Sequence, residues 1–395
     1  MLNEKNVKLG KVRSSIRELF EYGKKRKAEI GEDKVFDFSL GNPSVPVPGE
    51  VTEILTGLLK DCDPVALHGY TSAPGDYSVR KSLADYANSQ YGTHLTADCF
   101  YMTCGASASL TATLNALLNE GEEVITFVPC FPEYKVFCEH AGGKLICVDT
   151  REDDFQIDFE KFERALGDKT KAVLINSPNN PSGVVYSEQS IKKLSKILLD
   201  FSKKRGSPVY LISDEPYREL VYDDSIKVPC VMNYYDKSII CYSYSKSLSL
   251  PGERIGYVAV NNAMEEWQDV FAGVCGAGRA LGFVCAPNLF QQLVARTCGM
   301  TSDISIYKKN RDRLCSALQS FGFTVVKPDG AFYLFVKSPE PDANAFAERA
   351  KKYEILIVSG DDFGRKGYVR ICYCVSPEMI ERSLPAFKAL KDSYK

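Results

Sequence analysis

The sequence predicts an α/β protein whose large domain is built on a doubly wound, mostly parallel seven-stranded sheet and is followed by a smaller α+β domain. Between about residues 99 and 260, seven short apolar runs alternate with longer amphipathic stretches, a pattern typical of repeated strand–helix units. Beyond about residue 282, long helical stretches are interleaved with a few short strands. The chain has 395 residues, which is enough for one large domain and one smaller one.

The individual elements follow this alternation in order. The predicted strands of the large domain are residues 100–103, 123–127, 144–148, 172–176, 209–213, 238–242 and 257–260, and its predicted helices include 107–119, 187–203 and 265–272. In the smaller domain, helices are predicted over residues 288–296, 302–321, 342–351 and 377–391. We expect the large domain to span 46–285 and the smaller domain 286–395. Residues 1–45 should form an N-terminal arm and part of the smaller domain.

Two features mark the N-terminal part of the chain. Residues 3–31 are predicted to form an extended arm followed by an amphipathic helix. Residues 41–48, with the sequence GNPSVPVP, are predicted to be a stiff linker because prolines restrict the backbone.

Composition narrows the classes of function. Charged residues make up 25% of the chain and the formal net charge is −2, which gives no basic signal for nucleic acid or an anionic membrane. No apolar segment resembles a signal peptide or a membrane span, so we expect a cytoplasmic protein. The 14 cysteines form no Cys-x-x-Cys pair and there are only three histidines, so no metal site is predicted. Small polar ligands are the expected partners.

The most informative motif surrounds Lys246, which follows Ser243 and Ser245 and precedes Arg254. A lysine amine forms a Schiff base with an aldehyde, and hydroxyls and a guanidinium bind phosphate. Together these groups indicate a phosphorylated aldehyde, for which pyridoxal phosphate is the obvious candidate. Taken alone, the same residues also fit a solvated surface or the Ser-x-x-Lys nucleophile of serine β-lactamases. The second alternative requires a later Lys-Thr-Gly segment, which the sequence lacks.

Further candidate ligands follow the predicted strands, because ligands collect at the carboxyl ends of strands in open α/β sheets. Gly105, Ala106 and Ser107 follow the strand 100–103 and open a helix, where small residues and free N–H groups favour a phosphate. Phe131 follows the strand 123–127 and could stack on an aromatic ligand, although a core position explains it too.

Polar residues follow the next two strands of the predicted sheet. Asn180 lies in the proline-rich loop 177–183, where turn formation is the alternative explanation. Asp214 and Tyr217 follow the strand 209–213. A carboxylate after an apolar strand requires a partner, and a protonated ring nitrogen would suit Asp214, with a helix N-cap as the alternative.

These motifs, in this order, resemble the fold-type I pyridoxal-phosphate enzymes and in particular the class I/II aminotransferases. The resemblance covers about residues 14–391. It is carried by Tyr70 with Gly75, Gly105-Ala106-Ser107, Phe131, the Asn-x-x-x-Asn-Pro-Ser-Gly segment from Asn176 to Gly183, Asp214 with Tyr217, Ser243 with Lys246, Arg254 and Arg370.

The resemblance implies a role for each of these residues. Lys246 would be the Schiff-base lysine, and it, Asp214 and Tyr217 are the expected catalytic residues. The phosphate ligands it implies are Ser243, Ser245, Arg254 and the segment Gly105, Ala106 and Ser107. Asp214 would pair with the pyridine nitrogen, Tyr217 and Asn180 would contact the ring hydroxyl oxygen, and Phe131 would stack on the ring.

The resemblance also implies how substrate and a second subunit are bound. Arg370 would hold the substrate α-carboxylate, helped by Asn180 and the backbone at Gly41. Tyr70 would reach the phosphate of the neighbouring subunit, which implies a homodimer.

The implied activity is transfer of an amino group from an L-amino acid, with aspartate as the first expectation, to a 2-oxo acid such as 2-oxoglutarate. A carbon–sulfur β-lyase, an aromatic or alanine-type aminotransferase, and a transcription regulator built on the same fold are the alternatives. The regulator is disfavoured because only about 35 residues precede Leu40 and the chain is not basic. Arg279 or Arg17 could read a distal carboxylate, or be a surface or interface arginine, and Glu253 has no predicted role.

Overall fold

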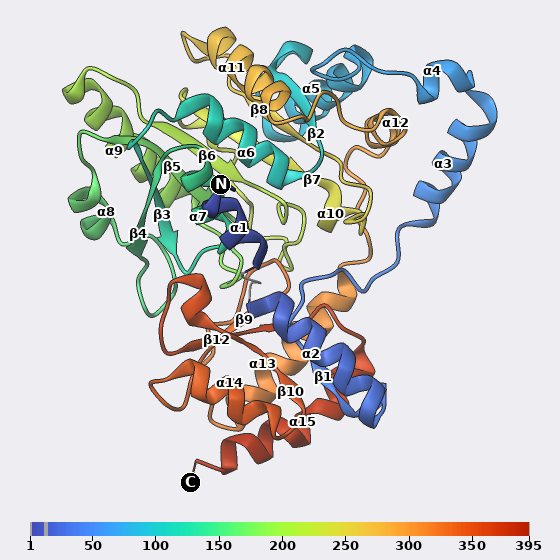
Figure 1. Ribbon diagram of the computed structural model, residues 1–395, viewed down its shortest axis with the longest axis vertical. Helices are drawn as coiled ribbons and strands as arrows, with labels where there is room; N and C mark the ends of the chain where they lie inside the picture. The colour runs from blue at the N-terminus through green and yellow to red at the C-terminus, as the bar shows by residue number, and fades with distance from the viewer. Residues whose placement is uncertain (1, 12–14, 395) are drawn as a thin grey trace.

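The computed structural model describes residues 2–11 and 15–394 (Figure 1). It divides into a larger part around one wide sheet and a smaller part with its own hydrophobic core, and the C-terminal end of the chain lies in the smaller part. The strands of the wide sheet are β2 (Phe100–Thr103), β3 (Glu123–Val128), β4 (Lys144–Asp149), β5 (Thr170–Asn176), β6 (Tyr210–Asp214), β7 (Ser238–Ser243) and β8 (Gly256–Val260). Their order across the sheet is β2-β8-β7-β6-β5-β3-β4. Only β8 runs antiparallel to its neighbours, so the predicted seven-stranded, mostly parallel sheet is confirmed.

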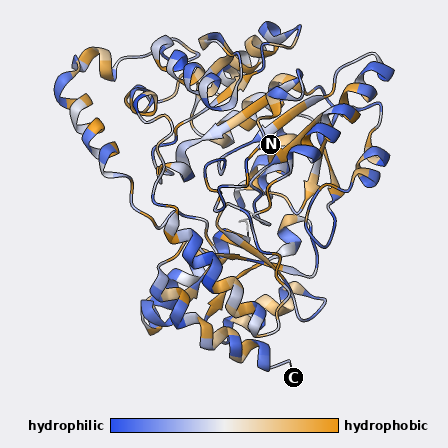
Figure 2. Cartoon of the chain, turned by 180° about the vertical axis from the view of Figure 1, so that it is seen from behind, coloured by the Kyte–Doolittle hydropathy of each residue, from blue (hydrophilic) through white to orange (hydrophobic). Residues whose placement is uncertain are grey.

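Helices cover both faces of this sheet (Figures 1 and 2). One face carries α5 (Tyr77–Tyr91), α9 (Glu188–Arg205) and α12 (Asn288–Arg296), and the other carries α6 (Ala106–Leu117), α7 (Glu133–His140) and α11 (Trp267–Ala280). Along β5, Val173 and Ile175 pack into the first cluster, whereas Ala172 and Leu174 pack into the second. Successive side chains of a strand point to opposite faces, so a strand buried on both faces needs a continuous apolar run.

The remaining helices of the larger part are short or peripheral. They are α3 (Gly49–Asp61), α4 (Pro64–His68), α8 (Phe159–Ala165) and α10 (Tyr244–Ser247), together with the 3-10 turns η2 (Ala97–Cys99) and η3 (Val231–Asn233). Among these, α10 matters most for the site because it carries Lys246 directly after β7.

The smaller part contains an antiparallel sheet of order β11-β12-β9 and a parallel pair β1-β10. Its strands are β1 (Phe36–Asp37), β9 (Tyr333–Lys337), β10 (Ile355–Leu356), β11 (Val358–Ser359) and β12 (Tyr368–Cys372). Its helices are α2 (Ser15–Ile30), α13 (Ser305–Ser320), α14 (Ala343–Lys351) and α15 (Pro377–Asp392), with η1 (Glu32–Lys34) and η4 (Gly360–Phe363). Leu19 of α2 packs against Leu356 and Val358, which ties the N-terminal segment to this part.

Two details differ from the sequence-based expectations. Residues 4–11 form helix α1 (Glu4–Lys11) rather than an extended arm. Helix α12 packs on the core of the wide sheet through Leu293 and Val294. We therefore propose a domain boundary near residue 300, after α12, in place of one at 286. Within the described residues, no helix combines the length and the apolar character needed to cross a membrane.

Candidate active site

The strand ends of the wide sheet bring the predicted site residues to one edge. Asn176 at the end of β5 is the register partner of Asp214 at the end of β6. Ser243 at the end of β7 pairs with Gly256, which also pairs with Thr103 at the end of β2. Parallel strands end at the same edge, so the residues that follow them in the chain converge there.

Lys246 is held on the first turn after β7 with its amine turned toward the N-terminal linker. Its Nζ donates a hydrogen bond to the carbonyl oxygen of Gly41 at 2.8 Å and lies 5.6 Å from the centre of the Phe332 ring. Burial lowers the pKa of the Lys246 ammonium, and the nearby guanidinium groups of Arg254 and Arg370 lower it further. A larger fraction of this amine is therefore neutral than for an exposed lysine.

Three side chains form a cluster of donors beside Lys246. The Ser243 and Ser245 hydroxyls lie 2.7 Å apart, and Ser243 caps α10 by accepting from the Ser245 N–H at 3.2 Å. Arg254 Nη1 donates to Ser245 Oγ at 3.4 Å. Hydroxyls, a guanidinium and a helix start next to one another suit an anionic group such as phosphate.

Gly105 allows the Arg254 guanidinium to lie close to the start of helix α6. Its φ of +83° favours glycine, and a Cβ at this position would lie 2.7 Å from Arg254 Nη2. Arg254 Nη2 also donates to the carbonyl oxygen of Cys104 at 3.3 Å. Ala106 begins α6, and Ser107 is exposed on its first turn, so free N–H groups face the same region.

Asp214 provides the most specific chemical signal in the site. The carboxylate is buried, and its Oδ2 accepts a hydrogen bond from the Tyr134 hydroxyl at 2.5 Å and a longer one from Asn176 Nδ2 at 3.5 Å. The other oxygen, Oδ1, is buried and has no hydrogen-bond partner in the described part of the chain. Burial raises the pKa of Asp214 to about 7, while the bond from Tyr134 opposes that rise. An unpaired buried carboxylate oxygen fits an N–H donor such as a pyridinium nitrogen.

Tyr217 and Asn180 reach the same space from two loops. The hydroxyls of Tyr217 and Tyr333 lie 3.0 Å apart, and burial raises the pKa of Tyr217. The Asn180 backbone N–H donates to Asn176 Oδ1 at 2.7 Å, which fixes the loop after β5. Phe131 is partly buried and meets the Tyr134 ring edge-on, with ring centres 5.6 Å apart.

Arg370 enters the site from β12 of the smaller part. Its Nη1 donates to Asn180 Oδ1 at 3.2 Å and its Nη2 to the carbonyl oxygen of Ser39. The guanidinium lies between the rings of Tyr333 and Phe363, 4.7 and 4.8 Å from their centres. The Arg370 side chain is buried, and it forms no ion pair with the described residues. Its Nε also has no hydrogen-bond partner among those residues. A buried cation without a counter-ion is suited to binding an anionic ligand.

Sequence reasoning did not single out four residues that shape this site. Tyr134 positions Asp214 through its hydrogen bond. The Tyr333 hydroxyl lies so close to Gly41 that a Cβ at position 41 would overlap it, so the linker passes close to the site. Cys372 and Cys374 are buried with their sulfur atoms 2.9 Å apart. Cys374 Sγ lies 3.1 Å from the carbonyl oxygen of Asn42, beside the glycine that accepts from Lys246.

Several predicted candidates lie outside this cluster in the single chain. Tyr70 is 95% exposed, so it does not line the site of this chain. Arg17 and Arg279 are also exposed, and neither forms an ion pair with the residues described. Glu253 is partly exposed, and no role for it emerges from its surroundings.

Comparison with known proteins places this geometry in context. A family model described as aminotransferase class I and II matches residues 33–387. A probable aspartate aminotransferase of Methanocaldococcus jannaschii is 30% identical over 385 residues, covering 95% of this chain and 96% of the relative. An aspartate aminotransferase of Thermotoga maritima is 31% identical, covering 93% and 95%. The crystal structure of an amino transferase from Eubacterium rectale has a TM-score of 0.98 and 54% identity, covering 100% of this chain and 99% of the other.

Proposed function

This chain belongs to the family of class I and II aminotransferases, and from that premise we propose that it transfers the amino group of an L-amino acid, with aspartate as the first choice, to a 2-oxo acid such as 2-oxoglutarate. As a member of that family it is a pyridoxal-phosphate-dependent transaminase. The observation that best supports a site for this cofactor is the buried Asp214 carboxylate with one unpaired oxygen. The names of the relatives from Methanocaldococcus jannaschii and Thermotoga maritima support aspartate as the donor.

We assign the cofactor ligands from the donors present in the site. Ser243, Ser245 and Arg254, with the N–H groups at the start of α6, would hold the phosphate. Asp214 would keep the pyridine nitrogen protonated, and each pKa unit by which it does so corresponds to about 1.4 kcal/mol. When bound, pyridoxal phosphate supplies an electron sink for the carbanion that forms when an amino acid loses its α-proton.

Lys246 is proposed as the general base that removes that proton. Burial and the neighbouring guanidinium groups lower its pKa, so the neutral amine, which is the form that accepts a proton, is more accessible than in an exposed lysine. The Gly41 carbonyl oxygen accepts from Nζ at 2.8 Å, and it would stabilise the ammonium that forms when Lys246 takes up the proton.

Arg370 and Asn180 are proposed to bind the α-carboxylate of the substrate. The guanidinium is held between two rings and carries an unpaired Nε, so it is oriented before substrate arrives. Ser39 and Gly41 approach the site from residues 39–41, at the start of the linker, and Arg370 approaches from the smaller part. Movement of these two segments toward the sheet edge would exclude water from the reacting atoms.

A homodimer is part of this proposal. The exposed Tyr70 would reach the phosphate site of the partner subunit, and the exposed Arg279 or Arg17 would supply a cation for the distal carboxylate of aspartate.

The decisive experiment measures rates for a panel of amino donors with 2-oxoglutarate, and then each donor without any acceptor. We expect turnover to be fastest with aspartate and to require the acceptor. Faster turnover with aromatic amino acids or alanine would replace aspartate as the substrate. Release of pyruvate and ammonia from cystathionine without an acceptor would identify a carbon–sulfur lyase instead.

A further inference from the structure

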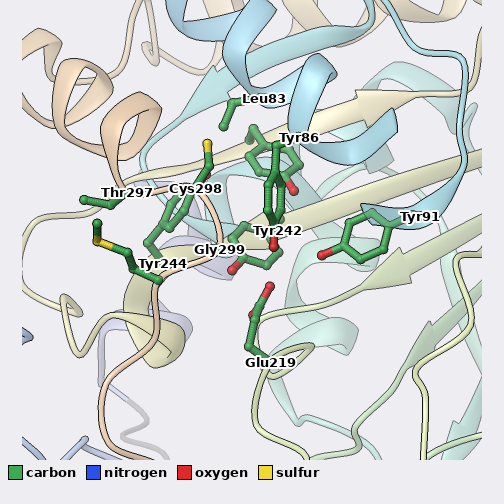
Figure 3. Close-up of a pocket in the computed structure, with 11 residues that line it drawn as sticks. Leu83, Tyr86, Tyr91, Glu219, Tyr242, Tyr244, Thr297, Cys298 and Gly299 are labelled. Atoms are coloured by element: carbon green, nitrogen blue, oxygen red, sulfur yellow. The ribbon is translucent and has the colours of Figure 1, made fainter. Parts of the chain in front are cut away.

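A pocket in the larger part is lined in part by Tyr244, which belongs to the same short helix α10 as Lys246 (Figure 3). Its walls include five tyrosines, namely Tyr86, Tyr91, Tyr242, Tyr244 and Tyr257, and it also contains Glu219. The Tyr242 and Tyr257 rings stack with centres 4.9 Å apart, and Tyr86 meets Tyr91 edge-on at 6.0 Å. The pocket is therefore aromatic around a single carboxylate.

The Glu219 carboxylate has an unsatisfied oxygen in this pocket. Figure 3 shows the carboxylate and the Tyr91 hydroxyl pointing toward one another, below the ring of Tyr242. Glu219 Oε2 is buried and has no hydrogen-bond partner among the residues that the structure describes. Burial raises the pKa of Glu219 to about 7, while the Tyr242 hydroxyl and the Arg218 guanidinium lower it. Burial therefore disfavours the charged form, and with a pKa of about 7 the carboxylate is partly ionised at neutral pH, in a place where nothing is bonded to Oε2 among the described residues.

The adjacent Arg218 does not supply the missing partner. Its Nε donates to Glu215 Oε2 at 2.5 Å, and its Nη1 and Nη2 donate to the carbonyl oxygens of Val228 and Pro229 at 3.1 and 3.3 Å. The guanidinium also lies over the Tyr91 ring, 4.5 Å from its centre. All three nitrogens are thus engaged, and the buried Glu215 balances the charge.

We propose that this pocket binds one small monovalent cation, such as potassium or ammonium, at the Glu219 carboxylate. The carboxylate supplies the opposite charge, and tyrosine hydroxyl oxygens and ring faces supply further favourable contacts for a weakly hydrated cation. The cavity of about 20 Å³ has room for one small ion or about one water. A divalent ion is disfavoured because no group of three acidic, histidine or cysteine ligands exists within the described residues.

The position of the pocket gives the cation a structural effect on the active site. Tyr244 lies two residues before Lys246, and the Tyr242 hydroxyl lies 3.0 Å from Ser247 Oγ in the same turn. The Ser247 carbonyl oxygen accepts from the Ser302 N–H at 2.7 Å, close to the segment 297–300 that closes the pocket. A bound cation would stabilise the position of helix α10, which carries Lys246, without contacting the reacting atoms.

The test measures the melting temperature of the holoenzyme in lithium, sodium, potassium, ammonium and tetramethylammonium chloride at constant ionic strength. We expect potassium and ammonium to raise the melting temperature saturably, by about 2 °C or more at high concentration, relative to tetramethylammonium, which is too large for the cavity. Equal melting temperatures in all five salts would show that the pocket holds only water and would overturn the proposal.

Variants locate the effect. Glu219→Gln keeps the shape of the side chain and should abolish the potassium-specific shift, whereas Glu163→Gln, on the exposed face of α8, should retain it. Tyr86→Phe removes one hydroxyl and should weaken the apparent affinity several-fold, which gives an independent measurement if Glu219→Gln does not fold. A potassium shift that is unchanged in Glu219→Gln, or in Tyr86→Phe where the first variant is unfolded, would contradict the site.

Discussion

The Tyr134 hydroxyl donates a hydrogen bond to Oδ2 of Asp214 at 2.5 Å, while Oδ1 of the same carboxylate is buried without a partner in the described part of the chain. The bond fixes the plane of the carboxylate and leaves one oxygen directed into the site. It also favours the ionised form of Asp214, whose pKa burial has raised to about 7. Tyr134 therefore controls both the orientation and the charge of the residue proposed to hold the pyridine ring.

Replacement Tyr134→Phe tests this relationship. Without the hydroxyl, Oδ2 keeps only the 3.5 Å contact from Asn176, so the pKa of Asp214 should rise further above its ordinary value. A hydrogen bond to a charged group contributes about 1.5–3 kcal/mol, so kcat/KM at pH 7 should fall roughly 10- to 100-fold. The acidic limb of the pH profile should move to higher pH.

The control for this variant is Tyr235→Phe, which removes a buried hydroxyl that donates to the Val209 carbonyl oxygen, away from the site. Its pH profile should match that of the unaltered enzyme. An unshifted acidic limb in Tyr134→Phe would mean that Tyr134 does not set the charge of Asp214.

The raised pKa of Asp214 also predicts how stability depends on pH in the cofactor-free protein. The folded state holds a proton up to about pH 7, whereas the unfolded chain releases it near 3.8, so folding stability should fall between these values and level off above pH 7. Asp214→Asn removes the buried charge and should stabilise the cofactor-free protein by roughly 2–4 kcal/mol at pH 8, while abolishing transamination.

Urea unfolding of the cofactor-free protein at pH 5, 6, 7 and 8 measures this difference. Glu219, whose pKa is also raised to about 7, contributes a slope of the same sign, so part of the pH dependence should persist in Asp214→Asn. If Asp214→Asn is less stable than the unaltered protein at pH 8, the carboxylate has a stabilising partner that the geometry does not reveal.

The central sheet could be predicted because burial on both faces forces continuous apolar runs. Predicted and observed strands agree except at their ends, where Asp214 and Ser243 continue the hydrogen-bonded ladder although both are polar. Helix α1 is only eight residues long, is mostly polar and buries no residue, so its two large apolar residues, Val7 and Leu9, form too short a pattern from which to predict a helix. The packing of α12 could not be predicted either, since its partners α3 and α5 lie more than 190 residues earlier in the chain.

Lys246, Asp214 and Asn180 lie at or just after the carboxyl ends of three strands, and these ends share one edge of the sheet, so the sequence pattern predicts that the three residues meet. The residues that contact this site from other loops, such as Tyr134 and Tyr333, are not marked by any pattern in the sequence. Tyr134 lies 80 residues from Asp214, and Tyr333 lies 116 residues from Tyr217. These contacts depend on how separate loops fold toward the edge, and no local pattern of residues encodes them.

Lys246→Ala tests the proposed base and the covalent attachment of the cofactor. Transamination should fall by at least about 10²–10⁴-fold, the range typical of general acid–base catalysis. Borohydride reduction of the unaltered enzyme should fix the cofactor on the peptide that contains Lys246, and the variant should show no such adduct. Lys196→Ala, at an exposed position of α9, is the matched control and should retain both properties. Normal turnover by Lys246→Ala would remove this lysine from the mechanism.

Comparison of Arg370→Ala with Arg254→Ala tests the division of roles between the two arginines. Arg370 contacts Asn180 and Ser39 and should act on substrate, so its loss should raise KM for the amino donor roughly 10- to 100-fold while the cofactor stays bound. Arg254 contacts Ser245, so its loss should weaken cofactor binding and leave KM nearly unchanged once cofactor is in excess. Equilibrium dialysis measures the cofactor and steady-state rates measure KM. Release of cofactor from Arg370→Ala would reverse the assignment, because a guanidinium that binds only the substrate carboxylate has no contact through which to retain the phosphate.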